Sequence, residues 1–152
     1  AVLPQSIALA RRQGSKVAVL FVDLDRFKEV NDTFGHATGD EVLIETGRRL
    51  SRAIRDSDFL ARIGGDEFVV LLNEINSVDD AALVASTIRE ALHGPIHTGS
   101  SSLVVTPSIG ISLFPEDGEE ADSLLAHADA AMYRVKTDGR DNLRFYSARE
   151  NP

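Results

Sequence analysis

Two adjacent carboxylates beside a pair of glycines form the part of this sequence best suited to chemistry. Asp66 and Glu67 follow Gly64-Gly65, and β-prone apolar residues lie on both sides of the group. The pattern predicts a hairpin with strands over 59–63 and 68–72 and with positive φ at the glycines. Acidic side chains on a rigid turn, next to backbone without side chains, suit a metal ion and a phosphate. A solvated turn without chemistry is the commoner explanation for such a stretch taken alone.

A third carboxylate, Asp23, ends the most apolar run of the chain, residues 16–23. We expect this run to form a central strand that is buried on both faces. Metal-dependent phosphoryl transfer needs acidic oxygens that converge from separate segments. Asp23 and Asp66 would supply them if their two strands are neighbours. Otherwise Asp23 only caps the turn that follows its strand.

Polar residues suited to a nucleotide follow Asp23. A short helix is predicted over 27–34 with Asp25 as its N-cap, and its first N–H groups together with Lys28 could bind a phosphate. Asn31 and Asp40 carry groups that read guanine, because a carboxylate accepts from N1–H and N2–H₂ while an amide donates to O6 or N7. Each of these residues also has a plain structural explanation. Lys28 would be an exposed lysine, Asn31 a cap at a helix end, and Asp40 an acid that opens the next helix after a loop.

Two further charge pairs have both a functional and a structural explanation. Lys136 and Arg140 flank a glycine-containing turn and could bind terminal phosphates or complement a helix C-terminus. Arg55 precedes Asp58 by three residues, which is most often a surface ion pair of little energetic weight.

The composition excludes several classes of function. The chain has 152 residues, 43% of them hydrophobic and 26% charged, which fits one globular domain. It has no cysteine, so disulfides, thiol catalysis and Cys-ligated zinc are excluded. A net charge of −8 argues against a nucleic-acid polymer as partner, although it allows a nucleotide with Mg²⁺. No apolar run is long enough to span a bilayer and no signal peptide is visible.

The order of the predicted elements indicates the class of fold. Helices and strands alternate, but the hairpin interrupts the alternation, which favours an α/β (α+β) fold with a mixed or mainly antiparallel sheet over a doubly wound parallel one. Pro107 implies an edge position or a bulge within the apolar stretch 102–114. The chain begins inside a predicted helix, so we expect a domain excised from a longer protein. The predicted helices cover residues 5–13, from 40 to about 54, from 77 to 93 and 122–136, and the last strand covers 142–146.

Three separated motifs resemble those of the GGDEF family, the diguanylate cyclases of bacterial signalling. The signature is Gly64-Gly65-Asp66-Glu67-Phe68. The other two motifs lie at 23–40, with Asp-Leu-Asp-Arg-Phe-Lys and Gly-His-Ala-Thr-Gly-Asp, and at 128–142, with Ala-Asp-Ala-Ala-Met-Tyr and Gly-Arg-Asp-Asn. The resemblance covers nearly the whole chain, so residues 1–152 are expected to be a single domain of this kind.

The resemblance implies a fold, a reaction and an assembly. The fold is the palm of polymerases and class III nucleotide cyclases, a mainly antiparallel sheet flanked by helices. The reaction condenses two GTP molecules into cyclic di-GMP and two pyrophosphates, with Mg²⁺ (or Mn²⁺) as cofactor. Each domain holds one GTP, so activity requires a homodimer in which each 3′-hydroxyl meets the other α-phosphate. The location implied is the bacterial cytoplasm, without membrane contact by this domain, whether or not the full-length protein is membrane-anchored.

The resemblance also assigns roles to individual residues. Asp23, the main-chain carbonyl of Leu24 and Asp66 would hold Mg²⁺, and Glu67 is a further candidate ligand or base. Asp66 would help to deprotonate the attacking hydroxyl, and Lys28 would stabilise phosphate charge. The remaining substrate contacts implied are Phe27 (backbone), Asn31 and Asp40 (guanine), His36, Gly64 and Gly65 (space for the nucleotide), and Lys136 and Arg140 (outer phosphates). Arg55 and Asp58 fit the family's product-inhibition motif, which binds cyclic di-GMP.

Two features keep an alternative open. The family usually carries an Asp-x-Leu-Thr-Gly-Leu-Pro-Asn-Arg-like segment before the first helix, and this chain starts beyond most of it. The stretches 113–118 and 145–146 are similar to those of GGDEF domains followed by an EAL phosphodiesterase domain. The alternative function is therefore a catalytically silent module that binds GTP or cyclic di-GMP and regulates an attached enzyme. A cyclase for another base is a third hypothesis, against which Asn31 and Asp40 argue.

Overall fold

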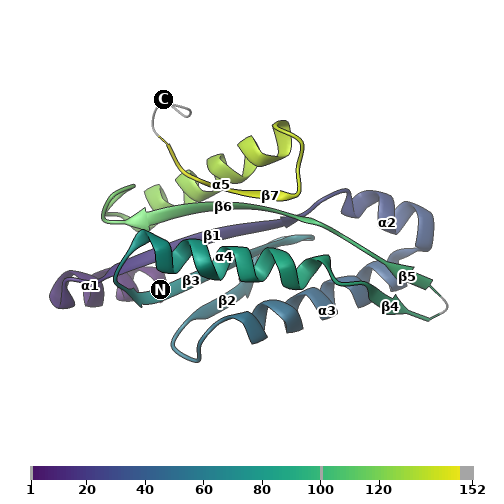
Figure 1. Ribbon diagram of the computed structural model, residues 1–152, viewed down its shortest axis with the longest axis horizontal. Helices are drawn as coiled ribbons and strands as arrows, with labels where there is room; N and C mark the ends of the chain where they lie inside the picture. Colours follow the sequence, from purple (N-terminus) through teal and green to yellow (C-terminus); the bar gives the residue numbers. More distant parts are fainter. Residues whose placement is uncertain (1, 100, 148–152) are drawn as a thin grey trace.

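The computed structural model describes residues 2–99 and 101–147, which form a five-stranded sheet with helices on both faces (Figure 1). The strand order is β2-β3-β1-β6-β7, and β4 and β5 form a separate two-stranded sheet. The predicted class, a mainly antiparallel central sheet flanked by helices, is confirmed. The elements are α1 (Val2–Gln13), β1 (Lys16–Leu24), α2 (Phe27–Phe34), α3 (His36–Ala53), β2 (Phe59–Arg62), β3 (Glu67–Ile75), α4 (Val78–His93), β4 (Ile96–Thr98), β5 (Ser101–Leu103), β6 (Pro107–Phe114), α5 (Ala121–Thr137) and β7 (Asn142–Phe145).

The predicted central strand, β1, lies in the middle of the sheet. It pairs antiparallel with β3 on one side and with β6 on the other, and β6 pairs parallel with β7. Successive residues of β1 point to opposite faces of the sheet. Leu20 and Val22 pack into the core under α3 and α4, whereas Val19 and Phe21 pack under α1 and α5. Burial on both faces explains why the strand is a nearly unbroken apolar run.

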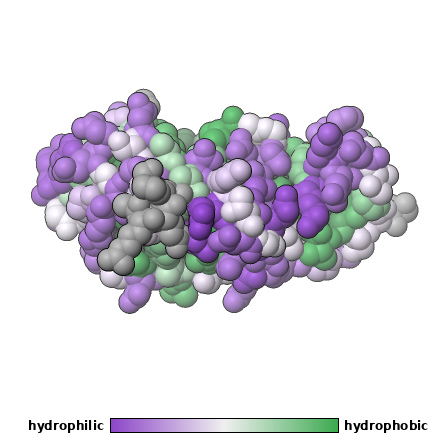
Figure 2. All heavy atoms as spheres, turned by 90° about the horizontal axis from the view of Figure 1, so that it is seen from above, coloured by the Kyte–Doolittle hydropathy of each residue, from purple (hydrophilic) through white to green (hydrophobic). Residues whose placement is uncertain are grey.

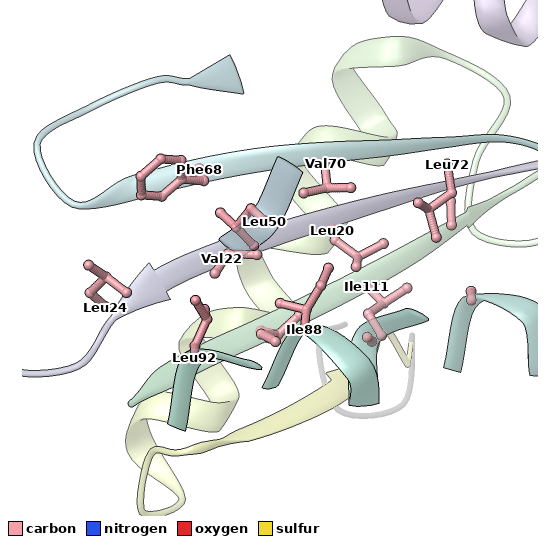
Figure 3. Close-up of a cluster of buried hydrophobic side chains, with 14 of the residues drawn as sticks. Leu20, Val22, Leu24, Leu50, Phe68, Val70, Leu72, Ile88, Leu92 and Ile111 are labelled. Atoms are coloured by element: carbon pink, nitrogen blue, oxygen red, sulfur yellow. The ribbon is translucent and has the colours of Figure 1, made fainter. Parts of the chain in front are cut away.

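Large aliphatic side chains fill the core between the sheet and the helices α3 and α4 (Figure 3). Leu20, Leu72 and Ile111 extend from the sheet towards Ile88 of α4, and Leu50 of α3 belongs to the same cluster. On the opposite face, α5 approaches β6 so closely that a Cβ on Gly110 would lie 2.1 Å from the carbonyl oxygen of Ala128. This close contact fixes α5, and with it the residues at its C-terminal end, against the strand next to β1.

Several predicted boundaries are wrong. The third helix begins at His36 rather than Asp40, because residues 36–39, which were predicted as part of a loop, form the first turn of α3 directly after Gly35. Pro107 is the first residue of β6, which is an interior strand rather than an edge strand. Pro107 pairs with Leu24 of β1, and the ladder with β7 begins one residue later, at Ser108. A first position tolerates proline because the N–H that proline lacks is not needed by the ladder there. Part of the stretch before Pro107 forms the unpredicted β4–β5 hairpin.

The surface is mostly polar on the side of α5 and β7, with hydrophobic residues in separate patches (Figure 2). Within the described ranges, no helix is long and apolar enough to cross a lipid bilayer.

Candidate active site

The end of β1 and the β2–β3 hairpin bring the predicted carboxylates together. Asp23 is paired in register with Glu67, the first residue of β3. The N–H of the next residue, Leu24, donates to the carbonyl oxygen of Asp66 at 3.2 Å. The N–H and C=O of a strand residue point to the same side, so the carbonyl of Leu24 also points towards the hairpin. The condition set by the sequence, that the two strands are neighbours, is therefore met.

The hairpin turn places Gly64 and Gly65 directly before the two carboxylates. The turn spans residues 63–66 and is closed by the Ile63 N–H, which donates to the carbonyl oxygen of Glu67 at 3.0 Å. Neither glycine has the predicted positive φ, because a turn of this length does not need the mirror-image types of two-residue hairpins. A Cβ on Gly64 would lie 3.0 Å from Glu67 Oε1, and one on Gly65 would meet nothing within 4 Å. Gly65 therefore leaves open space beside Asp66.

The carboxylates destabilise one another's charged forms. Burial of Asp23 raises its pKa to about 7, helped by a hydrogen bond with Asp66 and by the charges of Asp66 and Glu67, while Lys136 opposes the shift. Burial likewise raises the pKa of Glu67, and the charges of Asp129 and Asp66 add to this effect. Asp129, an exposed residue of α5, is not among the predicted site residues, and its charge acts on Glu67 only in the folded protein.

The donor set fits a divalent cation. Asp23 Oδ1 is buried and has no hydrogen-bond partner among the described residues, and carboxylate and carbonyl oxygens are the ligands that hard cations prefer. In the described part of the chain, no three acidic or histidine side chains are arranged to hold a metal ion by themselves. Mg²⁺ commonly binds one or two carboxylates and completes its shell with water and substrate phosphates. Asp23, the Leu24 carbonyl and Asp66 would hold such an ion, with Glu67 beside them.

Lys136 lies deeper in the site than the sequence suggested. Its Nζ is 3.5 Å from Asp23 Oδ2 and 3.4 Å from Asp25 Oδ1, so it bridges the two carboxylates. This position neutralises part of the negative charge beside the candidate metal ligands.

The prediction that Asp25 caps α2 is wrong. The N-cap is Arg26, which has a left-handed backbone, and no side chain makes a capping hydrogen bond. The Asp25 side chain is only 4% exposed. It accepts hydrogen bonds from Thr106 Oγ1 at 2.7 Å, from Ser108 Oγ at 2.6 Å and from the Asp141 N–H at 3.0 Å. Because Thr106, which precedes β6, the start of β6 and the α5–β7 turn supply these donors, tertiary contacts replace the local cap.

The residues proposed to read guanine lie where α2 meets α3. Asn31 is half-buried, and its Oδ1 has no hydrogen-bond partner in the described part of the chain. A Cβ on Gly39 would lie 1.9 Å from that oxygen, so a larger residue at position 39 would force the Asn31 side chain to move. Asp40 follows Gly39 and is exposed, as is His36 at the start of α3. At the start of α2, Phe27 is buried and Lys28 is exposed.

Arg55 and Asp58 lie away from the carboxylates, at the opposite end of β2 from the hairpin turn. The Asp58 side chain is only 1% exposed. It accepts from the Arg55 guanidinium at 3.1 Å and from the Asn73 N–H at 3.0 Å, and Arg55 also donates to the Asn73 carbonyl. The hydrogen bond to Asp58 raises the pKa of Arg55. The pair is therefore more than a loose surface ion pair, because it ties the start of β2 to β3.

The raised pKa of Asp23 predicts how stability depends on pH and on metal. The carboxyl titrates near 3.8 in its ordinary state and near 7 in the folded protein, so the folded state binds more protons between these values and stability falls as pH rises. We expect Asp23→Asn to raise the free energy of unfolding at pH 8, without metal, by about 1–3 kcal/mol. The gain should shrink as the pH is lowered towards 4. Urea denaturation with EDTA measures this difference.

Mg²⁺ should offset the loss of stability that ionisation of Asp23 causes as the pH rises. It competes with the proton for Asp23, so it should raise the melting temperature of the unsubstituted protein more at pH 8 than at pH 6. The same addition should leave Asp23→Asn nearly unchanged. Equal stabilisation of both proteins would show that Mg²⁺ binds elsewhere.

Comparison with known proteins agrees with this geometry. The family model described as "Diguanylate cyclase, GGDEF domain" matches residues 2–142. The chain is 42% identical over 149 residues to the bifunctional diguanylate cyclase/cyclic di-GMP phosphodiesterase MucR of Pseudomonas aeruginosa, covering 98% of this chain and 22% of MucR. It is 43% identical over 143 residues to the diguanylate cyclase TpbB of the same organism, covering 93% of this chain and 33% of TpbB. The chain thus spans about a fifth to a third of the length of these relatives.

Solved structures show the same fold. The GGDEF domain of TpbB superposes with a TM-score of 0.96 at 39% identity, covering 98% of this chain and 87% of that one. The GGDEF domain of DgcB from Caulobacter crescentus, solved in complex with c-di-GMP, superposes with a TM-score of 0.83 at 28% identity, covering 93% of this chain and 84% of that one. With its matching motifs, sheet topology and clustered carboxylates, this chain belongs to the GGDEF family of diguanylate cyclase domains.

Proposed function

We propose that this domain is an active diguanylate cyclase that condenses two GTP molecules into cyclic di-GMP and two pyrophosphates. The observation that carries the proposal is the convergence of Asp23, Asp66 and Glu67 beside the open turn at Gly65. This is the arrangement that metal-dependent attack of a hydroxyl on a phosphate requires.

The carboxylates have different roles at the reacting atoms. Asp23, the Leu24 carbonyl and Asp66 would hold Mg²⁺, which when bound would stabilise the charge on the α-phosphate and lower the pKa of the 3′-hydroxyl. Asp66 lies on the turn, beside open space, and accepts the proton of the 3′-hydroxyl. Glu67 has a raised pKa and is the second candidate for this base.

The rest of the nucleotide lies along α2 and α3. Asn31 and Asp40 read guanine, with His36 near the base, and adenine is rejected because it leaves the Asp40 carboxylate unpaired. The N–H groups at Phe27 and the ammonium of Lys28 bind phosphate at the start of α2. Lys136 and Arg140 bind the outer phosphates. When a nucleotide with Mg²⁺ enters, Lys136 exchanges part of its contact with Asp23 and Asp25 for phosphate oxygens.

The reaction needs two copies of the domain. Each site holds one GTP, so two sites face each other across a two-fold axis and each 3′-hydroxyl meets the partner's α-phosphate. An isolated domain at low concentration therefore binds GTP without turning it over.

One observation favours a second candidate function. MucR combines a cyclase with a phosphodiesterase in one protein, and this chain matches only a fifth of it. A domain in such a protein can bind GTP or cyclic di-GMP and regulate its neighbour without catalysing. The complete set of metal, guanine and phosphate residues favours the active cyclase over this regulatory module.

A forced dimer tests the proposal. The domain is fused to a parallel dimeric coiled coil and incubated with GTP and Mg²⁺, and both cyclic di-GMP and pyrophosphate are quantified. We expect two pyrophosphates for each cyclic di-GMP and no product from ATP. GTP binding without product, at high protein concentration, would overturn the cyclase and leave the regulatory module.

Product inhibition gives a separate prediction. Arg55 and Asp58 line a cavity of about 280 Å³ with residues of β3 and α4, and the relative DgcB was solved with c-di-GMP. We expect Arg55→Ala to raise the concentration of cyclic di-GMP that halves the rate by about tenfold or more, since it removes charge-assisted hydrogen bonds to the ligand. The initial rate should stay within about threefold, because Arg55 lies far from the carboxylates.

Arg52→Ala is the matched control for this experiment. Arg52 is exposed on the last turn of α3, three residues before Arg55, and its loss should leave inhibition unchanged. If inhibition by cyclic di-GMP is unaltered in Arg55→Ala, the Arg55–Asp58 pair has only a structural role.

A further inference from the structure

The turn between α5 and β7 has an unfavourable backbone that must be held in place. Gly139, Arg140 and Asp141 have consecutive positive φ values of 115°, 65° and 48°. Only glycine adopts this region at little cost, and residues with a Cβ persist there when the surrounding structure over-determines them. Arg140, the proposed contact for the outer phosphates, is the middle residue of this run.

Two main-chain N–H groups of the turn donate to acceptors outside it. The Arg140 N–H donates to the carbonyl oxygen of Val135 at 2.9 Å. The Asp141 N–H donates to Asp25 Oδ2 at 3.0 Å, on the same carboxylate whose other oxygen lies 3.4 Å from Lys136 Nζ. The position of Asp141 is thereby linked to both proposed outer-phosphate residues.

Two side chains of α4 also contact Asp141. Arg89 donates through Nε and Nη2 to the main-chain carbonyl of Asp141, at 3.2 and 3.0 Å, and through Nε to Asp141 Oδ1 at 3.2 Å. His93 Nε2 lies 2.5 Å from the same Oδ1. Arg89 and His93 are four residues apart and so lie on one face of the helix, which packs against β7.

These contacts affect the orientation of Asp141 more than they affect the free energy of unfolding. Arg89, His93 and Asp141 have side chains that are 34%, 35% and 36% exposed, and ion pairs with such access to water contribute little to folding. The fork of hydrogen bonds from the Arg89 guanidinium nevertheless restricts the orientation of Asp141 strongly. Because the fork acts on the residue next to Arg140, its loss would change where Arg140 points.

We propose that Arg89 and His93 are positioning residues for phosphate binding. Acting through Asp141, they fix the backbone of Arg140 and the Asp25 carboxylate that orients Lys136, and so they raise the affinity of the site for a triphosphate. This inference rests on the proposed GTP site, although it does not require that the site be catalytic.

Nucleotide binding, rather than turnover, tests the inference. The dissociation constants of Mg·GTP and of guanosine are measured on the same proteins, by calorimetry and by NMR titration. We expect Arg89→Gln to weaken GTP binding about 5- to 10-fold, the scale of one misplaced charge-assisted hydrogen bond. Guanosine binding should stay within about twofold, because the base contacts of α2 and α3 do not involve the turn. Asp141→Asn and His93→Gln should act in the same direction.

Two further variants separate positioning from stability. Arg89→Lys keeps the charge but cannot form the fork, so it should recover little of the GTP affinity. Glu90→Gln alters an exposed residue on the same helix and should change neither constant. Equal weakening of GTP and guanosine would mean a merely structural role and overturn the inference, as would unchanged GTP binding. A wild-type domain that binds GTP but makes no cyclic di-GMP contradicts the proposed function alone.

Discussion

Asp66→Asn is expected to lower the rate of cyclic di-GMP formation by about 10³-fold or more, because it removes a carboxylate that is both a proposed metal ligand and the proposed base. The fold should be unaffected. Asp66 lies in the hairpin turn, and the hydrogen bond that ties the turn to Leu24 uses the main-chain carbonyl of Asp66 rather than its side chain. The rate is measured with the forced dimer at saturating GTP and Mg²⁺, and the fold is checked by its melting temperature.

The control replaces an acid that lies outside the site. Asp56→Asn, in the exposed segment before β2, should retain full activity. If Asp66→Asn keeps more than about a tenth of the wild-type rate, the base is not Asp66. Glu67→Gln then becomes the decisive variant, because Glu67 is the neighbouring carboxylate with a raised pKa.

Asp25→Ala is expected to lower the free energy of unfolding by about 3–5 kcal/mol, the usual cost of removing one partner of a buried, hydrogen-bonded ion pair. The substitution leaves the hydroxyls of Thr106 and Ser108 and the N–H of Asp141 without their acceptor. It also leaves Lys136 with Asp23 as its remaining carboxylate partner among the described ion pairs. Urea denaturation at pH 7 measures the loss.

Two variants bracket this result. Asp25→Asn keeps the shape and part of the hydrogen bonding, so it should cost about half as much. Asp32→Ala removes an exposed acid of α2 and should change stability by less than about 0.5 kcal/mol. A loss below about 1 kcal/mol in Asp25→Ala would contradict the role of Asp25 as the residue that joins β1, β6 and the α5–β7 turn.

Local patterns in the sequence were sufficient for the central strand, for the β2–β3 hairpin and for the acidic residues beside them. The continuous apolar run before Asp23 required a strand buried on both faces, and Gly64-Gly65 between β-prone stretches required a hairpin. Each of these two predictions depends on residues within about ten positions of one another, so it could be made without knowing which strands are paired. The motifs then indicated the family, and the family implied that the two acidic segments meet.

The tertiary structure alone decided how the site is held. Asp25 has the sequence position of a helix cap, yet its acceptors are taken by Thr106, Ser108 and Asp141, from segments more than 80 residues away. Lys136 was expected to contact the outer phosphates, and it lies between two carboxylates. Gly64 and Gly65 were expected to have positive φ, and neither does. A buried carboxylate takes whichever donors the packed fold brings to it, and those donors leave no pattern in the neighbouring sequence.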